Sequence, residues 1–126
     1  QVKIENIKKD KSKNIIKDKK IDKIKIIEQL LKDFPPKELR GIIDQGKKEI
    51  DSGIIICIST FEDKVGVAVG VSTDLTSKYD AVDLAKIASE TLGGKGGGGR
   101  KDFAQAGGVD KNKVEKAFKE ISKKIS

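Results

Sequence analysis

The chain of 126 residues, 36% of them hydrophobic, is long enough for one compact domain with a modest core and too short for a two-domain enzyme. Its net charge of +7 favours an anionic partner such as nucleic acid or an acidic membrane surface, or it simply follows from a composition rich in lysine and isoleucine. Histidine is absent, which removes the commonest metal ligand and the usual general base, so we expect neither a metal site nor a catalytic residue.

The N-terminal part of the chain shows no regular pattern. It begins with Gln1, and the chain lacks methionine, which suggests a piece of a longer polypeptide. Residues 1–22 consist almost wholly of Lys, Asp, Ile and Asn, and their isoleucines fit no helical or strand period. We therefore expect a basic extension or linker over residues 1–22 and a globular domain over residues 23–126.

The next stretch predicts a strand followed by a helix. Ile24 and Ile26 alternate with lysines over residues 23–31, which favours a strand, with a short helix as the alternative. Two prolines at 35 and 36 end this element. Apolar residues then recur at helical spacing and predict an amphipathic helix over residues 37–51; they are Leu39, Ile42, Ile43 and Ile50.

Residues 54–59 are apolar and rich in β-branched side chains, which predicts a central strand covered on both faces. Cys57 lies in this run, so we expect it to fill the core. As the only cysteine it cannot form an internal disulfide or a cysteine metal cluster, and it favours a reducing compartment, the cytoplasm. Over residues 65–71 valines alternate with glycine and alanine, which predicts the second strand of a hairpin, with one bare face that a helix or loop can approach.

Two further helices complete the prediction. Asp80 is expected to cap a helix with Asp83 in its first turn, and capping explains these carboxylates and Asp74 better than metal binding. No apolar stretch approaches the roughly 20 residues that span a bilayer, so we expect a soluble protein without a membrane partner. The fold class is α+β, a small mixed sheet of about three strands packed with about three helices. The apolar positions of the two helices are Ala81, Leu84, Ala85, Ala88 and Leu92, and, after a start near Asp110, Val114, Ala117, Phe118, Ile121 and Ile125.

Between these helices lies GGKGGGGRKDFAQAGG, residues 93–108, which we call the glycine segment and expect to be a loop. It holds eight of the thirteen glycines. It lacks the Gly-Lys-Ser/Thr ending of a P-loop, and it follows a helix where a dinucleotide fingerprint would follow a strand. Glycine permits positive φ and leaves backbone N–H groups accessible to phosphates and sugars. The alternative is a packing role, in which the glycines allow close approach to the bare face at Gly66, Ala68 and Gly70.

Four stretches together carry a family resemblance: KELRGIIDQGKKEI, GIIICIST, VGVSTDLTSKYDAVDLAK and GGKGGGGRKDFAQAGG. Their order and spacing over residues 22–125 resemble the C-terminal domain of alanyl-tRNA synthetase, a module shared with DHH-type phosphoesterases. The phosphoesterase version usually carries a histidine after its glycines, whereas Arg100 and AQAGG at 104–108 point to the synthetase branch. The glycine run is one residue longer than the family pattern, and Lys101 replaces a common proline.

The resemblance implies a function that composition does not show. In the family this domain helps to hold tRNA at the outer corner of the L, where the D and T loops meet, and it couples aminoacylation with editing. The parent would be an ATP-dependent alanine–tRNA ligase, with ATP and Mg in a catalytic domain and zinc in an editing domain, and no cofactor in this fragment. The partners would be tRNA, above all alanine tRNA, the remaining parent domains, and a second copy in a homodimer. Residues 1–22 would then be a remnant of a helical dimerisation segment.

The candidate site is therefore a tRNA-binding surface without catalytic residues. Gln105 offers a donor and an acceptor to a base or ribose edge, or it braces the loop internally. We expect Phe103 to be a buried anchor rather than a base-stacking residue, and Asp102 to be either a solvated charge or a charge that braces the loop. The alternatives are the nucleic-acid-gripping substrate domain of a DHH-type phosphoesterase, and a dimerisation module. The predicted contact residues are Lys95, Gly96, Gly97, Gly98, Gly99, Arg100, Lys101 and Gln105.

Overall fold

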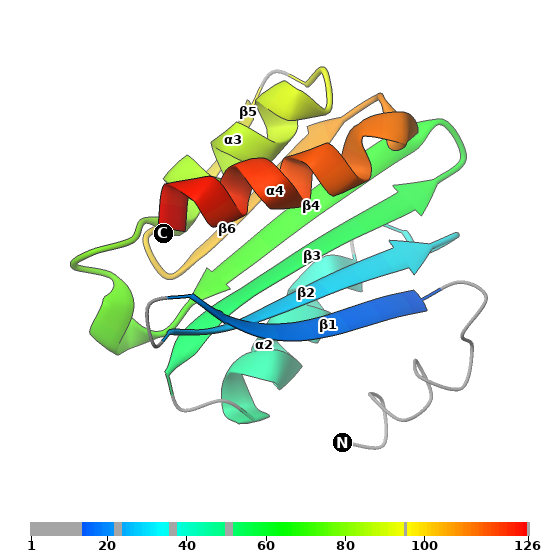
Figure 1. Cartoon of the computed structure of the whole chain (residues 1–126). Coiled ribbons are helices and arrows are strands. Elements are labelled where there is room, and N and C mark those ends of the chain that lie inside the picture. Colours follow the sequence, from blue (N-terminus) through cyan, green and yellow to red (C-terminus); the bar gives the residue numbers. More distant parts are fainter. Residues whose placement is uncertain (1–13, 22–23, 36–37, 50–51, 95, 126) are drawn as a thin grey trace.

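The computed structural model describes residues 14–21, 24–35, 38–49, 52–94 and 96–125. These residues form one six-stranded sheet and three α-helices (Figure 1). The elements are β1 (Asn14–Ile21), β2 (Ile24–Lys32), α2 (Leu39–Glu49), β3 (Gly53–Phe61), β4 (Lys64–Val71), η2 (Thr73–Leu75), α3 (Ala81–Thr91), β5 (Gly96–Arg100), β6 (Phe103–Gly108), η3 (Lys111–Lys113) and α4 (Val114–Ile125).

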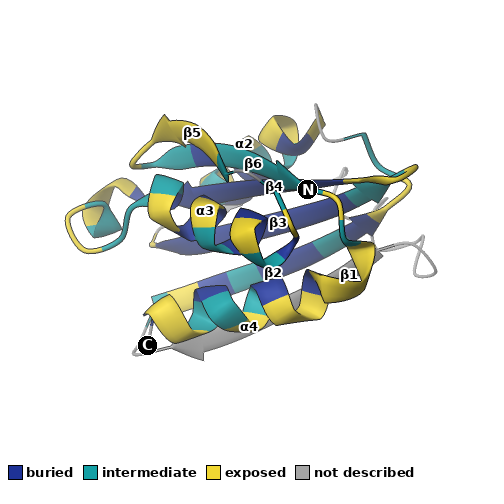
Figure 2. Cartoon of the chain, turned by 90° about the horizontal axis from the view of Figure 1, so that it is seen from above, coloured by how far each residue is buried: buried dark blue, intermediate teal, exposed yellow. Residues whose placement is uncertain are grey.

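The strands lie in the order β1-β2-β3-β4-β6-β5. β2 and β3 are parallel because α2 carries the chain back between them, and every other neighbouring pair is antiparallel. β3 and β4 therefore occupy the middle of the sheet and are buried along most of their length (Figure 2). β5 lies at one edge, and Figure 2 shows it largely exposed. The predicted central strand and hairpin are confirmed.

Helices cover both faces of the sheet (Figure 1). α3 and α4 bury the larger core against the branched side chains of β3 and β4, and α2 buries a smaller one on the opposite face. An added Cβ at Gly70 would lie 2.5 Å from Cγ2 of Ile43, so α2 sits directly on the bare face of β4. The sequence correctly predicted a close approach to this face, and a helix makes it rather than the glycine segment.

The predicted helices begin and pack largely as expected. The carboxylate of Asp80 accepts a hydrogen bond from the N–H of Val82 at 2.9 Å, which confirms the cap of α3. Asp110 caps the short η3 turn in the same way, through the N–H of Asn112, and the chain continues into α4. Among the described helices, none is both long and apolar enough to cross a membrane. The expected apolar residues of α3 and α4 are buried, except Phe118, which is half-buried against the larger core.

The number of strands differs from the prediction, because the sheet has six rather than about three. β5 and β6 form within the glycine segment, which was expected to be a loop. β1 forms within residues 1–22, which were expected to be an extension or linker. The remaining residues of that stretch, 1–13 and 22, lie outside the described residues. All three strands owe their order to a neighbouring strand, and neither glycines nor irregular isoleucines signal such pairing in the sequence.

Candidate nucleic-acid interface

The glycine segment folds into a β-hairpin, residues 96–108, which we call the glycine hairpin. Gly96, Gly97, Gly98, Gly99 and Arg100 form β5, Lys101 stands in the two-residue turn, and Gln105 lies opposite Gly98 on β6. The structure thus brings together all the predicted contact residues that it describes; Lys95 lies outside the described residues. β5 is the last of the described strands in the sheet, so one of its backbone edges pairs with no other described strand.

The glycines of β5 fall into two structural classes. A Cβ added at Gly97 would collide with the carbonyl oxygen of Gln105, and one added at Gly99, where φ is +153°, would collide with that of Phe103. These two glycines let β5 lie close against β6. Gly98 differs, because an added Cβ there would meet nothing within 4 Å. The packing role considered for the glycines therefore applies to Gly97 and Gly99 and is directed at β6, whereas Gly98 leaves an open surface.

Ser89 on α3 holds the start of the glycine hairpin, although sequence analysis did not identify it. Its fully buried hydroxyl donates a hydrogen bond to the carbonyl of Gly107 and accepts one from the N–H of Gly96 at 2.9 Å. Its own carbonyl accepts the N–H of Gly94 at 2.7 Å. A single serine thus joins both strands to the helix. Its only sequence signal is a small polar residue beside the buried alanines of α3.

Opposite charges brace the turn of the glycine hairpin. The Lys47 ammonium of α2 lies 3.6 Å from the Asp102 carboxylate and donates to the Asp102 carbonyl at 3.2 Å. The Arg100 guanidinium lies 3.9 Å from the same carboxylate. These contacts confirm the bracing role predicted for Asp102. The side chain of Arg100 is 73% exposed, so this ion pair contributes little to stability and leaves most of the guanidinium accessible.

Phe103 and Gln105 point to the same face of the sheet as α2, because both pair with small β4 residues that α2 covers. Phe103 is half-buried in the smaller core, which confirms its role as an anchor. The Arg40 guanidinium of α2 lies over its ring, 5.2 Å from the centroid. The amide of the half-buried Gln105 forms no hydrogen bond within the described part of the chain, so no internal bracing bond is found there.

Asp74 and Asp80, near the start of α3, both accept hydrogen bonds from neighbouring residues. Asp74 accepts a hydrogen bond from the Ser52 hydroxyl at 2.6 Å, and this bond, with a second from Ser72, lowers the pKa of its exposed carboxyl. Asp80 is used as the cap of α3. Across the described ranges, no three His, Cys, Asp or Glu residues gather in a way that could hold a metal ion.

Cys57 is fully buried in the smaller core, and burial raises the pKa of its thiol. We expect the thiol to resist a disulfide reagent such as DTNB in the native protein and to react fully in denaturant, because the thiolate is the reactive form. The measurement is the absorbance of released thionitrobenzoate with and without urea. Rapid labelling of the native protein at pH 8 would contradict a core position.

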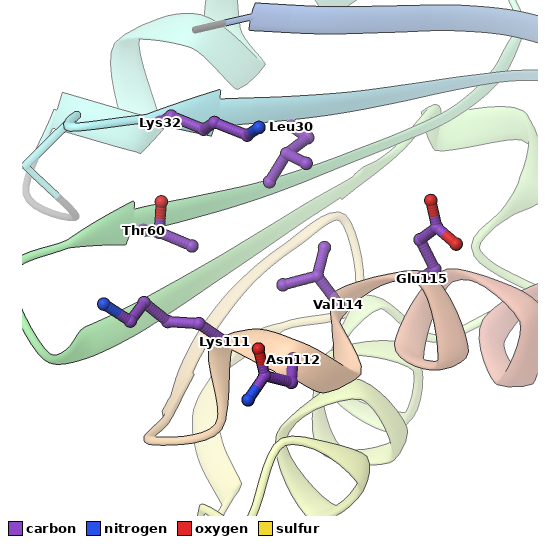
Figure 3. A pocket seen from close by; sticks show the side chains of 7 residues that line it. All are labelled: Leu30, Lys32, Thr60, Lys111, Asn112, Val114 and Glu115. Carbon is purple, nitrogen blue, oxygen red and sulfur yellow. The ribbon is translucent and has the colours of Figure 1, made fainter.

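A separate hollow of about 400 Å³ lies between the start of α4 and the ends of β2 and β3 (Figure 3). Leu30 and Val114 give it an apolar surface, and Lys111 already donates to the carbonyl of Glu62 at 3.0 Å. Lys32 lines the hollow as well, and the Glu115 carboxylate stands on the same rim.

Three comparisons place the chain among known proteins. Residues 22–126 match the family described as the DHHA1 domain. An alanine–tRNA ligase of Parvibaculum lavamentivorans is 48% identical over 96 residues, which cover 75% of this chain and 11% of that protein. An alanine–tRNA ligase of Rhodopseudomonas palustris is 48% identical over 103 residues, which cover 81% of this chain and 12% of that protein. The chain thus spans 11–12% of the length of these relatives.

Solved structures resemble the fold. The crystal structure of the C-Ala domain from Aquifex aeolicus alanyl-tRNA synthetase matches with a TM-score of 0.82 and 27% identity, over 87% of this chain and 98% of that one. A DHH-domain structure, described as a member of the s1p family of ribosomal proteins, matches with a TM-score of 0.59 and 19% identity. It covers 98% of this chain and 30% of that one, and the likeness is one of fold alone.

Proposed function

The chain belongs to the DHHA1 domain family, and on this premise we propose that it is the C-terminal, tRNA-binding module of an alanine–tRNA ligase. The observation that carries the proposal is the exposed edge strand of glycines next to Arg100 and Lys101. Its relatives are named alanine–tRNA ligases, and the solved domain that it resembles comes from an alanyl-tRNA synthetase. The RNA partner is alanine tRNA, contacted at the outer corner of the L.

The chemistry of the glycine hairpin suits a ribose–phosphate backbone. Folded RNA is recognised largely through its shape, its phosphates and its 2′-hydroxyl groups. Arg100 and Lys101 are exposed cations at one end of β5, and Lys95 adds a third charge to the sequence at the other end. Because no side chain projects from Gly98 into the open space beside it, an RNA strand can reach the protein backbone there.

In this proposal the module is not itself an enzyme. The parent ligase charges tRNA in a separate catalytic domain with ATP and Mg, and it removes mischarged amino acids in an editing domain with zinc. This module holds the tRNA for both steps in the cytoplasm, and it works with the other parent domains. The parent would form a homodimer; residues 14–21, expected to belong to its dimerisation segment, instead pair with β2 as β1.

A second candidate is the substrate domain of a DHH-type phosphoesterase, favoured by the fold likeness to a DHH-domain structure. Such a domain would grip nucleic acid for a metal-bearing partner domain. Arg100 stands where the phosphoesterase version usually has histidine, which favours the synthetase module.

The test is a titration of the chain with alanine tRNA, an unrelated tRNA and a simple RNA hairpin, each at two salt concentrations. We expect both tRNAs to bind more tightly than the hairpin, because the outer corner exists only in the folded L. Binding of equal strength to all three, with a steep salt dependence, would mean unspecific charge attraction and would contradict the proposal. A dimer seen by sedimentation without tRNA binding would favour the dimerisation module.

Replacing Lys95 and Arg100 together by alanine should weaken tRNA binding and flatten its dependence on salt, by about one unit of log–log slope for each phosphate that the variant no longer neutralises. The melting temperature should stay nearly unchanged, because Arg100 is largely exposed. The measurement is the tRNA affinity, from fluorescence anisotropy, at salt concentrations between 50 and 200 mM. Over this range a protein that makes many phosphate contacts loses about a few orders of magnitude in affinity. An unchanged affinity would place the RNA surface elsewhere on the chain.

A further inference from the structure

The two faces of the glycine hairpin are unlike each other. On one face α3 packs against both β5 and β6, and Ser89 joins the two strands to it. On the other face α2 packs against β3 and β4 and reaches the hairpin near its turn, at Asp102 and Phe103. Gly98 lies away from this contact, and a Cβ added there would meet nothing within 4 Å.

The strand register shows which residues lie beside this open space. Gly98 pairs with Gln105, and Gln105 pairs with Ala68, which belongs to the core under α2. Paired residues of neighbouring strands point to the same face, so Gly98 and Gln105 face the α2 side. The space beside Gly98 is open to at least 4 Å, and the Gln105 amide has no hydrogen-bond partner within the described residues. We call this surface the α2-side ledge.

A cation stands at the border of the α2-side ledge. Arg40 is exposed, and its stacking on the Phe103 ring orients a guanidinium whose planar N–H donors match a phosphate. The neighbouring Lys47 is less available, because its ammonium contacts both the carboxylate and the carbonyl of Asp102. Arg40 thus offers exposed and oriented hydrogen-bond donors to a phosphate on this side.

The exposed charges of the two helices next to the hairpin, α2 and α3, also differ. The exposed side chains of α3 are Asp83, Lys86 and Glu90, two carboxylates and one ammonium. Among the described side chains of α2, the exposed charged ones are Arg40, Asp44 and Lys48, two cations and one carboxylate. Next to the glycine hairpin, α3 thus carries one net negative exposed charge, and the described side chains of α2 carry one net positive exposed charge.

From the ledge, the oriented arginine and this charge difference, we propose that RNA enters the glycine hairpin from the α2 side. In this arrangement Arg40 binds a phosphate, the backbone crosses Gly98, and the amide of Gln105 binds a ribose hydroxyl. The inference rests on the proposed function and adds to it the face of approach and a binding residue on a different element. It assigns Arg40 a role that the basic residues of the hairpin alone would not suggest.

The experiment compares Arg40→Ala with Lys86→Ala in titrations with alanine tRNA. Both replacements remove one exposed positive charge near the hairpin, so unspecific attraction changes equally in the two variants. Arg40→Ala should weaken binding about tenfold, as the loss of a charge-assisted hydrogen bond does, whereas Lys86→Ala should leave the affinity within about twofold. Gln105→Ala, which leaves the stacked Arg40 in place, should weaken binding about threefold, as the loss of one neutral hydrogen bond does.

The outcomes separate this inference from the proposed function. Wild-type affinity retained by both Arg40→Ala and Gln105→Ala would overturn the α2-side approach and leave the tRNA-binding proposal intact. A reduction confined to Lys86→Ala would place the RNA on the α3 side and would likewise overturn it. No binding of tRNA by the wild-type chain would overturn both proposals. Melting curves of the three variants confirm that each difference in affinity arises from a folded protein.

Discussion

Gly97→Val is expected to lower the free energy of unfolding by about 2 to 4 kcal/mol, in the range of severe overpacking. A side chain at this position would collide with the carbonyl oxygen of Gln105 and with the backbone of Ala106, neither of which can move without separating β5 from β6. The loss has an upper limit, because β5 is an edge strand and can detach while β3 and β4 remain paired. Urea denaturation followed by circular dichroism measures the change.

The matched control is Gly98→Ala, one residue further along the same strand. Its new Cβ would meet nothing within 4 Å, so the free energy of unfolding should change by less than about 0.5 kcal/mol. Equal destabilisation by the two replacements would contradict the division of the glycines into a packing class and an open class. The same control protein separates stability from RNA affinity, because it keeps the hairpin folded while it adds a methyl group to the α2-side ledge.

Ser89→Ala should destabilise the domain by about 1 to 3 kcal/mol, the usual result of leaving buried polar groups without partners. The replacement takes a hydrogen-bond acceptor from the N–H of Gly96 and a donor from the carbonyl of Gly107, and the position is fully buried. Thermal and urea denaturation measure the change in stability. The expected order in stability is wild type, then Ser89→Ala, then Gly97→Val.

Thr91→Ala is the control for the serine replacement, since Thr91 lies on the same helix. Its hydroxyl donates only to the carbonyl of Ile87 one turn earlier, so its loss should be offset by the higher helix propensity of alanine. If Ser89→Ala proved as stable as Thr91→Ala, water would be satisfying the hairpin backbone, and the hydroxyl would not be its main attachment.

Elements with a strong apolar period could be predicted from the sequence. Each of their apolar patterns places the apolar side chains in the core in only one type of secondary structure. These patterns are the alternation in residues 65–71, the apolar run in residues 54–59 and the helical spacing of α3 and α4. The cap at Asp80 was equally predictable, because a side chain before a helix satisfies the helix's own N–H groups. These are local signals that the tertiary structure reinforces.

The strands β1, β5 and β6 could not be predicted in this way, because their order comes from neighbours. Four consecutive glycines have no side-chain period, and their β-propensity is low, so only pairing with β6 and the bonds to Ser89 make β5 a strand. β1 pairs along its whole length with β2, whose sequence gives no sign of a partner on that side. Contacts of this kind depend on residues far apart in the chain.

The candidate site was predictable in composition and not in geometry. The chemistry of glycines beside Arg100 and Lys101 pointed to an anionic backbone as ligand. The geometry follows from the strand register and from the position of α2. The register makes Gly97 pack against β6 and leaves Gly98 open, and the position of α2 places Arg40 over Phe103. Sequence alone assigns these residues to separate elements and gives no distance between them.

The attachment of the glycine hairpin through Ser89 also affects the chain entropy of the domain. Glycine loses more conformational freedom on ordering than any other residue, so β5 is costly to keep ordered and gains almost no apolar burial in return. Its position at the edge of the sheet separates that cost from the two cores, which lie against β3 and β4. β5 can therefore open and close as a local unit with a free energy well below that of global unfolding, and a ligand that orders it would be coupled to that opening.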